Sequence, residues 1–303
     1  MTRSSWLSLS GNPRHAIVFT TLSHLPAWWQ TVDGNPSWQS GVFFGLAGAY
    51  GIIGLVAVVQ LIRIQLRVPE YGWTTQKMFH LLNFIVCVLR MSVFVLREPI
   101  ASLKPVALQS VLLDLPGLLF TTTYTLLVLF WAEIYHQAKT LPTGNLRPTF
   151  IAFNLLVYAI QVGIWCFIAG SEKGSNLRIA RSLSAGFMGL VALAAAGGFI
   201  LYGGRLFLML RGFPVDSRGR KKKIQEVGMV TSICTLCFLV RALLVYLAAF
   251  DPKDCSLNVV THPLLNLIYY LMAEVLPSAL VLYILRKLPP KRNQQGYQSI
   301  PTK

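Results

Sequence analysis

Long apolar stretches recur along the chain, and seven of them are long enough to cross a bilayer. They lie at Gly41–Ile62, Met78–Leu96, Val106–Trp131, Thr149–Gly170, Ile179–Tyr202, Val227–Phe250 and Thr261–Leu285. A transmembrane helix needs about 20 mostly apolar residues. No alternating strand pattern competes with these stretches, and no span clearly repeats another. The pattern predicts an all-α membrane protein: a seven-transmembrane helix bundle in one domain (41–285), with a poorly ordered head (1–40) and a basic cytosolic tail (286–303).

The composition explains why a basic chain need not bind nucleic acid. The net charge is +16 and the pI is near 9.9, yet charged residues make up only 13% of the chain and hydrophobic residues 54%. Soluble domains carry roughly 25% charged residues. The densest basic segment, DSRGRKKK at 216–223, has no aromatic platform or nucleic-acid-reading module beside it. We therefore expect no direct binding of nucleic acid.

The distribution of Lys and Arg predicts the orientation of the bundle. Of the 27 Lys and Arg residues, 17 fall on the side of the C-terminal tail and eight on the opposite side, with Arg90 and Arg241 inside spans. Because cytosolic loops carry the excess of positive charge, the tail should be cytosolic and the N-terminus lumenal. The longest loop, Gly203–Gln225, would then be cytosolic. Its basic residues determine topology or bind anionic lipids or an acidic protein partner; they are Arg218, Arg220, Lys221, Lys222 and Lys223.

Polar residues at helical spacing mark the inward faces of several spans, because residues three and four apart share a face. These stripes are His80, Asn83, Cys87 and Arg90; Ser110, Asp114, Thr121 and Thr125; Asn154, Tyr158, Gln161 and Trp165; and Asn266, Tyr270, Glu274 and Ser278. The first span instead has a glycine seam suited to close helix contact. The seam consists of Gly41, Gly45, Gly48 and Gly51.

Four charged residues lie inside the spans, at Arg90, Asp114, Arg241 and Glu274. Each costs about 2.5–3.5 kcal/mol at a helix centre, so an unpaired charge would be a liability. Since spans adjacent in sequence usually pack together, we expect Arg90 to pair with Asp114 and Arg241 with Glu274. The pairs either hold the helix register or form a ligand pocket or ion path. Pro116 and Pro277 should kink their helices beside the two acids and widen the interior.

Catalytic signatures are missing from the sequence. It has no nucleophile elbow, zinc-protease motif, P-loop or dinucleotide-binding motif. Glu133 and His136, with His80 on the same side, resemble part of a metal site but lack a third firm ligand and a nucleophile. Cys234 and Cys237 lie on a membrane helix without a second pair. We expect no enzyme activity, cofactor or metal.

Several long segments resemble the plant Tobamovirus multiplication protein 1 and 3 family. They are LIRIQLRVPEYGWTTQKMFHLLNF, VLLDLPGLLFTTTYTLLVLFWAEIYHQAKTLP, LYGGRLFLMLRGFP and HPLLNLIYYLMAEVLPSALVLYILRKLPPKR. The resemblance covers about Trp38 to Arg292. The marks of G-protein-coupled receptors are absent: no Arg follows Glu133, and no Asn precedes Pro277.

The resemblance implies a seven-span protein of the vacuolar membrane that acts as a non-enzymatic anchor or scaffold for tobamovirus RNA replication. It implies binding of the viral replication protein through its helicase region, of a tetraspanin-like membrane protein and of an Arf-like small GTPase. It implies no active site. A receptor-like signalling protein or a transporter of protons or small solutes is the alternative, and a homo-oligomer stays open.

The tail carries one further pattern, in which Tyr297 precedes Ile300 by three residues. A tyrosine and a bulky apolar residue at this spacing resemble a sorting signal read by adaptor proteins. We interpret Tyr297 and Ile300 as a candidate signal of this kind.

Overall fold

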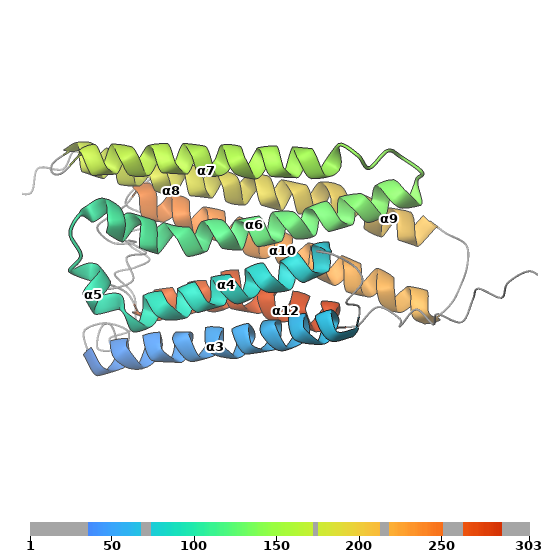
Figure 1. The fold of residues 1–303 in the computed structure, drawn as a ribbon, viewed down its shortest axis with the longest axis horizontal. Helices are drawn as coiled ribbons and strands as arrows, with labels where there is room; N and C mark the ends of the chain where they lie inside the picture. Colours follow the sequence, from blue (N-terminus) through green and yellow to red (C-terminus); the bar gives the residue numbers. More distant parts are fainter. Residues whose placement is uncertain (1–35, 68–73, 172–174, 213–217, 251–262, 287–303) are drawn as a thin grey trace, which may run out of the picture.

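Seven long helical segments dominate the computed structural model, which describes residues 36–67, 74–171, 175–212, 218–250 and 263–286 (Figure 1). All seven are long and apolar enough to cross a membrane, which confirms the predicted all-α bundle, and the described residues contain no strand. The segments are α3 (Pro36–Arg67), α4 (Thr75–Val95), α6 (Val106–Ala138), α7 (Leu146–Gly170), α8 (Ser175–Gly198) continuing through η1 (Phe199–Gly203) to α9 (Gly204–Gly212), α10 (Arg218–Phe250), and α11 (Pro263–Tyr270) continuing through η2 (Leu271–Val275) to α12 (Leu276–Leu285). A short helix, α5 (Arg97–Ala101), lies between α4 and α6.

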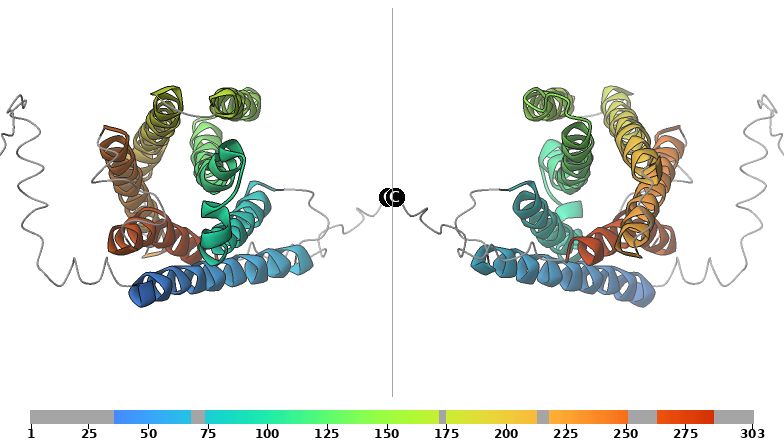
Figure 2. Two further views of the ribbon diagram at one scale, coloured as in Figure 1. Left: turned by 90° about the vertical axis from the view of Figure 1, so that its left-hand side faces the viewer. Right: turned by 90° about the vertical axis from the view of Figure 1, so that its right-hand side faces the viewer.

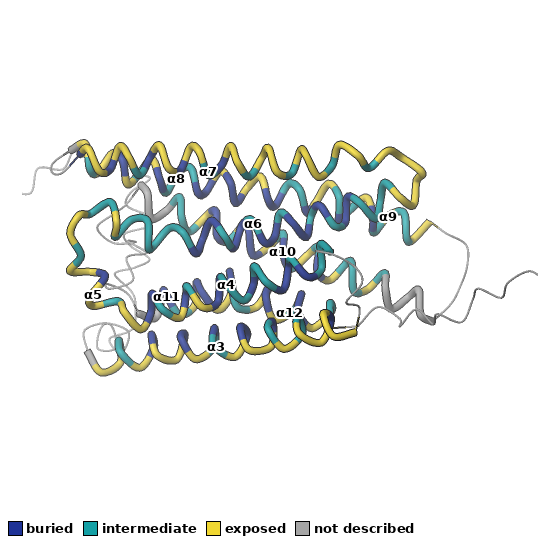
Figure 3. Tube along the Cα trace, viewed as in Figure 1, coloured by how far each residue is buried: buried dark blue, intermediate teal, exposed yellow. Residues whose placement is uncertain are grey.

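The spans form a closed ring, which the two end-on views make clear (Figure 2). Each span packs against the next along the chain, and the last span, α11–η2–α12, returns to pack against α3. The helix α7 packs mainly against its neighbours α6 and α8, and most of its surface is exposed (Figure 3). We call the end of the bundle at which α12 finishes the tail end; Gln76, at the start of α4, donates a hydrogen bond to the Leu285 carbonyl there (3.1 Å).

Aromatic side chains fill the interior between α6, η1 and α10. Tyr124 lies at their centre, with ring centroids 4.6 Å from Phe120, 5.4 Å from Phe238 and 6.2 Å from Phe199. Trp131 extends this aromatic core toward the tail end, 5.5 Å from Phe199. Burying rings of this size contributes strongly to packing, and the edge-to-face arrangements add to it.

The loop predicted at Gly203–Gln225 is largely helical, so that prediction was wrong. α9 continues to Gly212, and α10 begins at Arg218, which places the basic residues 218–223 in the first turns of a helix. Lys and Arg are good helix formers. A membrane helix can therefore continue past its apolar residues, and apolar length alone does not predict where it ends. Gly212 is the last residue of α9, and glycine is common at the C-terminal end of a helix.

Two π-helical turns interrupt the spans. η1 lies between α8 and α9, and η2 carries Glu274 and ends at Val275, two residues before Pro277. Proline lacks an N–H and cannot complete the usual helical ladder, so an irregular turn beside Pro277 is expected. Pro116, by contrast, lies inside an α6 that continues as one helix.

The predicted glycine seam of α3 is mostly unpacked. A Cβ atom added at Gly41, Gly45 or Gly48 would meet nothing within 4 Å. Close contact occurs at Gly51 and at Gly54, where an added Cβ would lie 3.1 Å from the Cβ of Cys87. The prediction was wrong at Gly41, Gly45 and Gly48 because larger residues, including Phe43 and Tyr50, occupy the buried face of this helix.

Candidate functional site: a buried ion cluster

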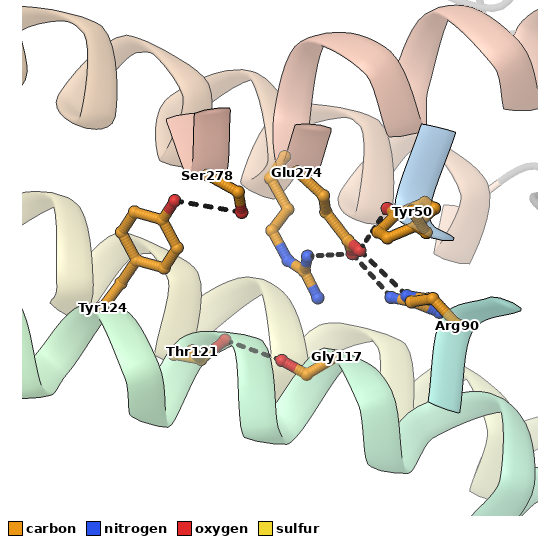
Figure 4. A network of polar contacts seen from close by, with 8 residues as sticks. Tyr50, Arg90, Gly117, Thr121, Tyr124, Glu274 and Ser278 are labelled. Carbon is orange, nitrogen blue, oxygen red and sulfur yellow. Dashed lines mark hydrogen bonds and ion pairs between the residues drawn. The ribbon is translucent and has the colours of Figure 1, made fainter. Parts of the chain in front are cut away.

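The carboxylate of Glu274 is the centre of a buried ion cluster formed with Tyr50, Arg90 and Arg241 (Figure 4). Arg90 donates two hydrogen bonds to it, from Nε to Oε2 (2.8 Å) and from Nη2 to Oε1 (2.5 Å). Arg241 donates from Nη1 to Oε1 (2.7 Å), and the Tyr50 hydroxyl donates to Oε2 (2.7 Å). Each of the four residues is at most 4% exposed, so the cluster is shielded from the surroundings of the bundle.

Four different spans supply the cluster, since its residues come from α3, α4, α10 and η2. The two arginines also lie over aromatic rings: Arg90 is 4.9 Å from the ring centroid of Tyr270, and Arg241 is 5.3 Å from that of Phe120. These cation–π contacts add to the attraction of the carboxylate. Two guanidinium groups share one carboxylate, so the cluster carries a formal charge of +1.

Gly117 on α6 forms the wall against which the arginines lie. A Cβ atom there would be 2.7 Å from Nη2 of Arg241 and 3.6 Å from Nη2 of Arg90. The absence of a side chain therefore allows both guanidinium groups to approach the backbone of α6.

Of the two predicted ion pairs, the structure confirms one and contradicts the other. Arg241 pairs with Glu274 as expected, but Arg90 also pairs with Glu274 and not with Asp114. Asp114 instead accepts hydrogen bonds from Trp165 Nε1 (3.1 Å), Ser184 Oγ (3.1 Å) and Gln161 Nε2 (3.3 Å). The prediction failed because Asp114 faces α7 and α8, whereas Arg90 faces α3 and η2.

The polar stripes of the sequence do point inward. His80, Asn83 and Gln161 are at most 1% exposed, as are Asn266 and Glu274. Sequence reasoning missed Tyr50 and Ser184, since neither belongs to a polar stripe. A tyrosine in the glycine-rich first span was the available signal for Tyr50.

The remaining candidates do not join the ion cluster. Glu133 pairs with Arg147 (2.8 Å), and His136 Nδ1 contacts the Pro142 carbonyl (3.1 Å). Within the described ranges, no group of three His, Cys, Asp or Glu residues could hold a metal ion. The side chains of Arg218–Lys223, together with Tyr297 and Ile300, lie outside what the structure describes.

The ion cluster joins four spans by charge-assisted hydrogen bonds, and this geometry is suited to holding helix positions. Charge-assisted bonds to a bidentate arginine are roughly twice as strong as neutral ones. Removing one partner of a buried ion pair leaves an uncompensated charge in the interior, and this strongly destabilises the fold.

Double-mutant cycles should show that Asp114 and Glu274 belong to different hydrogen-bond networks. We expect Arg90→Met and Asp114→Asn to couple more weakly than a hydrogen-bonded pair, because the two side chains share no hydrogen bond and attract each other only as separated charges. Asp114→Asn and Trp165→Phe should couple by roughly 0.5–3 kcal/mol, because they remove the two partners of one bond. Unfolding in detergent measures both. Strong coupling between Arg90 and Asp114, with none between Asp114 and Trp165, would contradict the arrangement.

Comparison with known proteins identifies close relatives of this chain. The profile of the family described as THH1/TOM1/TOM3 domain matches residues 24–301. The chain is 56% identical over 276 residues to Tobamovirus multiplication protein 1 of Arabidopsis thaliana, covering 91% of this chain and 93% of the relative. It is 52% identical over 292 residues to Tobamovirus multiplication protein 3 of the same plant, covering 96% and 95%. It is 54% identical over 273 residues to Tobamovirus multiplication protein 1 of Nicotiana tabacum, covering 90% and 93%. No solved structure matches the chain.

Proposed function

Because this chain belongs to the THH1/TOM1/TOM3 family, we propose that it is a host factor that anchors the tobamovirus replication protein to a membrane. The observation that carries the proposal is the sequence identity to proteins named for tobamovirus multiplication. It is 56% and 54% for two of them, over 91% and 90% of this chain. That identity spans the whole bundle. The seven apolar spans supply the membrane attachment that an anchor requires.

The proposed anchor is non-enzymatic and acts in the vacuolar membrane with its tail in the cytosol. The excess of Lys and Arg on the tail side supports the orientation. The first turns of α10, at 218–223, would then meet the cytosolic surface of the membrane. Basic residues there attract anionic lipids or an acidic protein surface by about 1 kcal/mol each.

The proposed partners are the helicase region of the viral replication protein, a tetraspanin-like membrane protein and an Arf-like small GTPase. The names of the relatives support a partner from the tobamovirus replication machinery. The resemblance described for the sequence supports the two host partners.

Binding of the replication protein to reconstituted vesicles tests the proposal. Vesicles containing the chain should bind the purified helicase region more strongly than vesicles of the same lipids alone. Replacing Arg220, Lys221, Lys222 and Lys223 with Gln should weaken this binding, with a smaller effect at high salt because exposed charges are screened.

Two outcomes would contradict parts of the proposal. Equal binding to vesicles with and without the chain would remove the anchor function. If the tail resists protease on vesicles with the cytosolic face outward, the proposed orientation is wrong, and residues 218–223 lie on the side opposite to the cytosol.

A receptor or transporter is the second candidate function, and the ion cluster is the observation that favours it. Ionisable residues within a membrane commonly mark ligand, ion or proton paths. A substitution in the ion cluster that retains folding and replication-protein binding but abolishes a signalling or flux response would favour this candidate.

A further inference from the structure

One face of α4 carries polar side chains along most of its length, all of them buried. Lys77, His80, Asn83 and Arg90 are at most 4% exposed, and Cys87 between them is 2% exposed. Successive members are three or four residues apart, so they lie one above another on one helix face. From Lys77 to Arg90 this face rises about 20 Å, from the tail end of the bundle to the ion cluster.

Gln60 of α3 lies at the same level as His80. A Cβ at Gly54 would be 3.1 Å from Cys87, and a Cβ at Gly51 would be 3.6 Å from the sulfur of Met91, so the helices run antiparallel in a known register. Continuing that register by six residues brings Gln60 to the level of Leu81, next to that of His80 along the bundle. We call Gln60 and these α4 residues the polar column.

Several polar atoms of the polar column have no protein partner among the described residues. They are both ring nitrogens of His80, Nδ2 of Asn83 and Oε1 of Gln60. A neutral imidazole needs one donor and one acceptor as partners, and leaving such groups unpaired in a protein interior is costly. Buried water typically satisfies groups of this kind, and each water molecule makes about three hydrogen bonds to polar groups of the protein.

The opposite side of the ion cluster is closed by aromatic rings. Phe94, one turn beyond Arg90, stacks with Phe43 (6.0 Å) and meets Tyr270 edge-on (4.9 Å). Phe43 and Phe94 are each 1% exposed, and Tyr270 is 6% exposed. Between α3 and α4, the surroundings of Glu274 are therefore polar toward the tail end and aromatic toward the other end, while the aromatic core around Tyr124 lies beside them between α6, η1 and α10.

We propose that the polar column holds a file of bound water molecules that connects the ion cluster with the tail end of the bundle. The water molecules satisfy His80, Asn83 and Gln60, and the aromatic rings end the file at Glu274. Water-sized solutes then reach the ion cluster from the tail end alone. This inference does not depend on the proposed role in virus multiplication.

Cys87 is a natural reporter, because its thiol lies within the polar column between Asn83 and Arg90. Cys234 is the matched control: like Cys87 it is buried in the hydrophobic core, but it lies on α10 and not on the polar face of α4. Two full-length variants would each retain one of these cysteines, with the other cysteines replaced by Ala. Silver ion, which is close to water in size, would be added to one side of sealed vesicles, and unreacted thiols would be labelled after denaturation.

Silver added at the tail side should block Cys87 at least about tenfold faster than Cys234, because thiol reactivity follows access. Silver added at the opposite side should leave Cys87 unreacted. Equal rates for the two cysteines, or reaction of Cys87 from the opposite side alone, would overturn the proposal.

A stability measurement provides a second test with native cysteines. If water satisfies Asn83, then Asn83→Leu displaces it and leaves its other partners unpaired, so Tm in detergent should fall by about 3 °C or more. If the polar column is dry, the same change removes an unsatisfied amide and Tm should rise. A raised Tm would overturn the proposal even if Asn83→Leu folds normally.

Discussion

Replacing Glu274 with Gln should lower the free energy of unfolding by about 3–5 kcal/mol, the largest loss we expect from any single substitution. The carboxylate is fully buried and is the shared acceptor of Arg90, Arg241 and Tyr50. Its neutral amide would leave two guanidinium groups in the interior without an anion. Unfolding in detergent, followed by loss of helical signal, measures the effect.

Restoring neutrality should recover much of this stability. Combining Glu274→Gln with Arg90→Met and Arg241→Met removes all three charges, and apolar replacement of a buried ion cluster is often neutral or stabilising. Glu133→Gln is a suitable control, because its partner Arg147 is 69% exposed and exposed pairs contribute about 0–1 kcal/mol. If Glu274→Gln were as mild as Glu133→Gln, the ion cluster would not hold the bundle together.

Gly203→Ala should destabilise the protein by about 1–3 kcal/mol, as overpacking of a close contact does. A Cβ at Gly203 would lie 2.6 Å from the Trp131 ring and 2.6 Å from the Thr231 hydroxyl. This position is the end of η1, which packs against both α6 and α10. Both neighbours would have to shift to admit even one methyl group.

The adjacent glycine provides the matched control for this prediction. A Cβ at Gly204 would meet nothing within 4 Å, so Gly204→Ala should be neutral or should stabilise by the better helix propensity of Ala. Thermal unfolding of both variants distinguishes the positions. Equal effects at Gly203 and Gly204 would contradict the packing around η1.

Local pattern predicted the seven spans and their inward faces. Apolar length identifies a membrane span, and helical spacing identifies which polar residues share a face, so His80, Asn83 and Arg90 could be assigned to the interior. The same reasoning identified Arg241 and Glu274 as partners. The resemblance to the family was a separate indication, carried by long and distinctive segments of the sequence.

The sequence could not predict which of the inward-facing helix surfaces pack against one another. Arg90 and Asp114 occupy neighbouring spans, yet they lie in separate networks because α6 turns Asp114 toward α7 and α8. Tyr50 joins the ion cluster only because the last span returns to pack against α3 and closes the ring. No local pattern encodes that closure.

By itself the sequence determined the number of spans, the residues that face inward and the excess of positive charge at one end. These properties depend on hydrophobicity and helical periodicity, which are local. The tertiary structure alone decided that one glutamate serves two arginines, that Gly54, outside the predicted seam, makes the closest contact of the α3 glycines, and that aromatic rings close one side of the ion cluster. Those features depend on how seven helices rotate and pack around a ring, and packing is a property of all of them together.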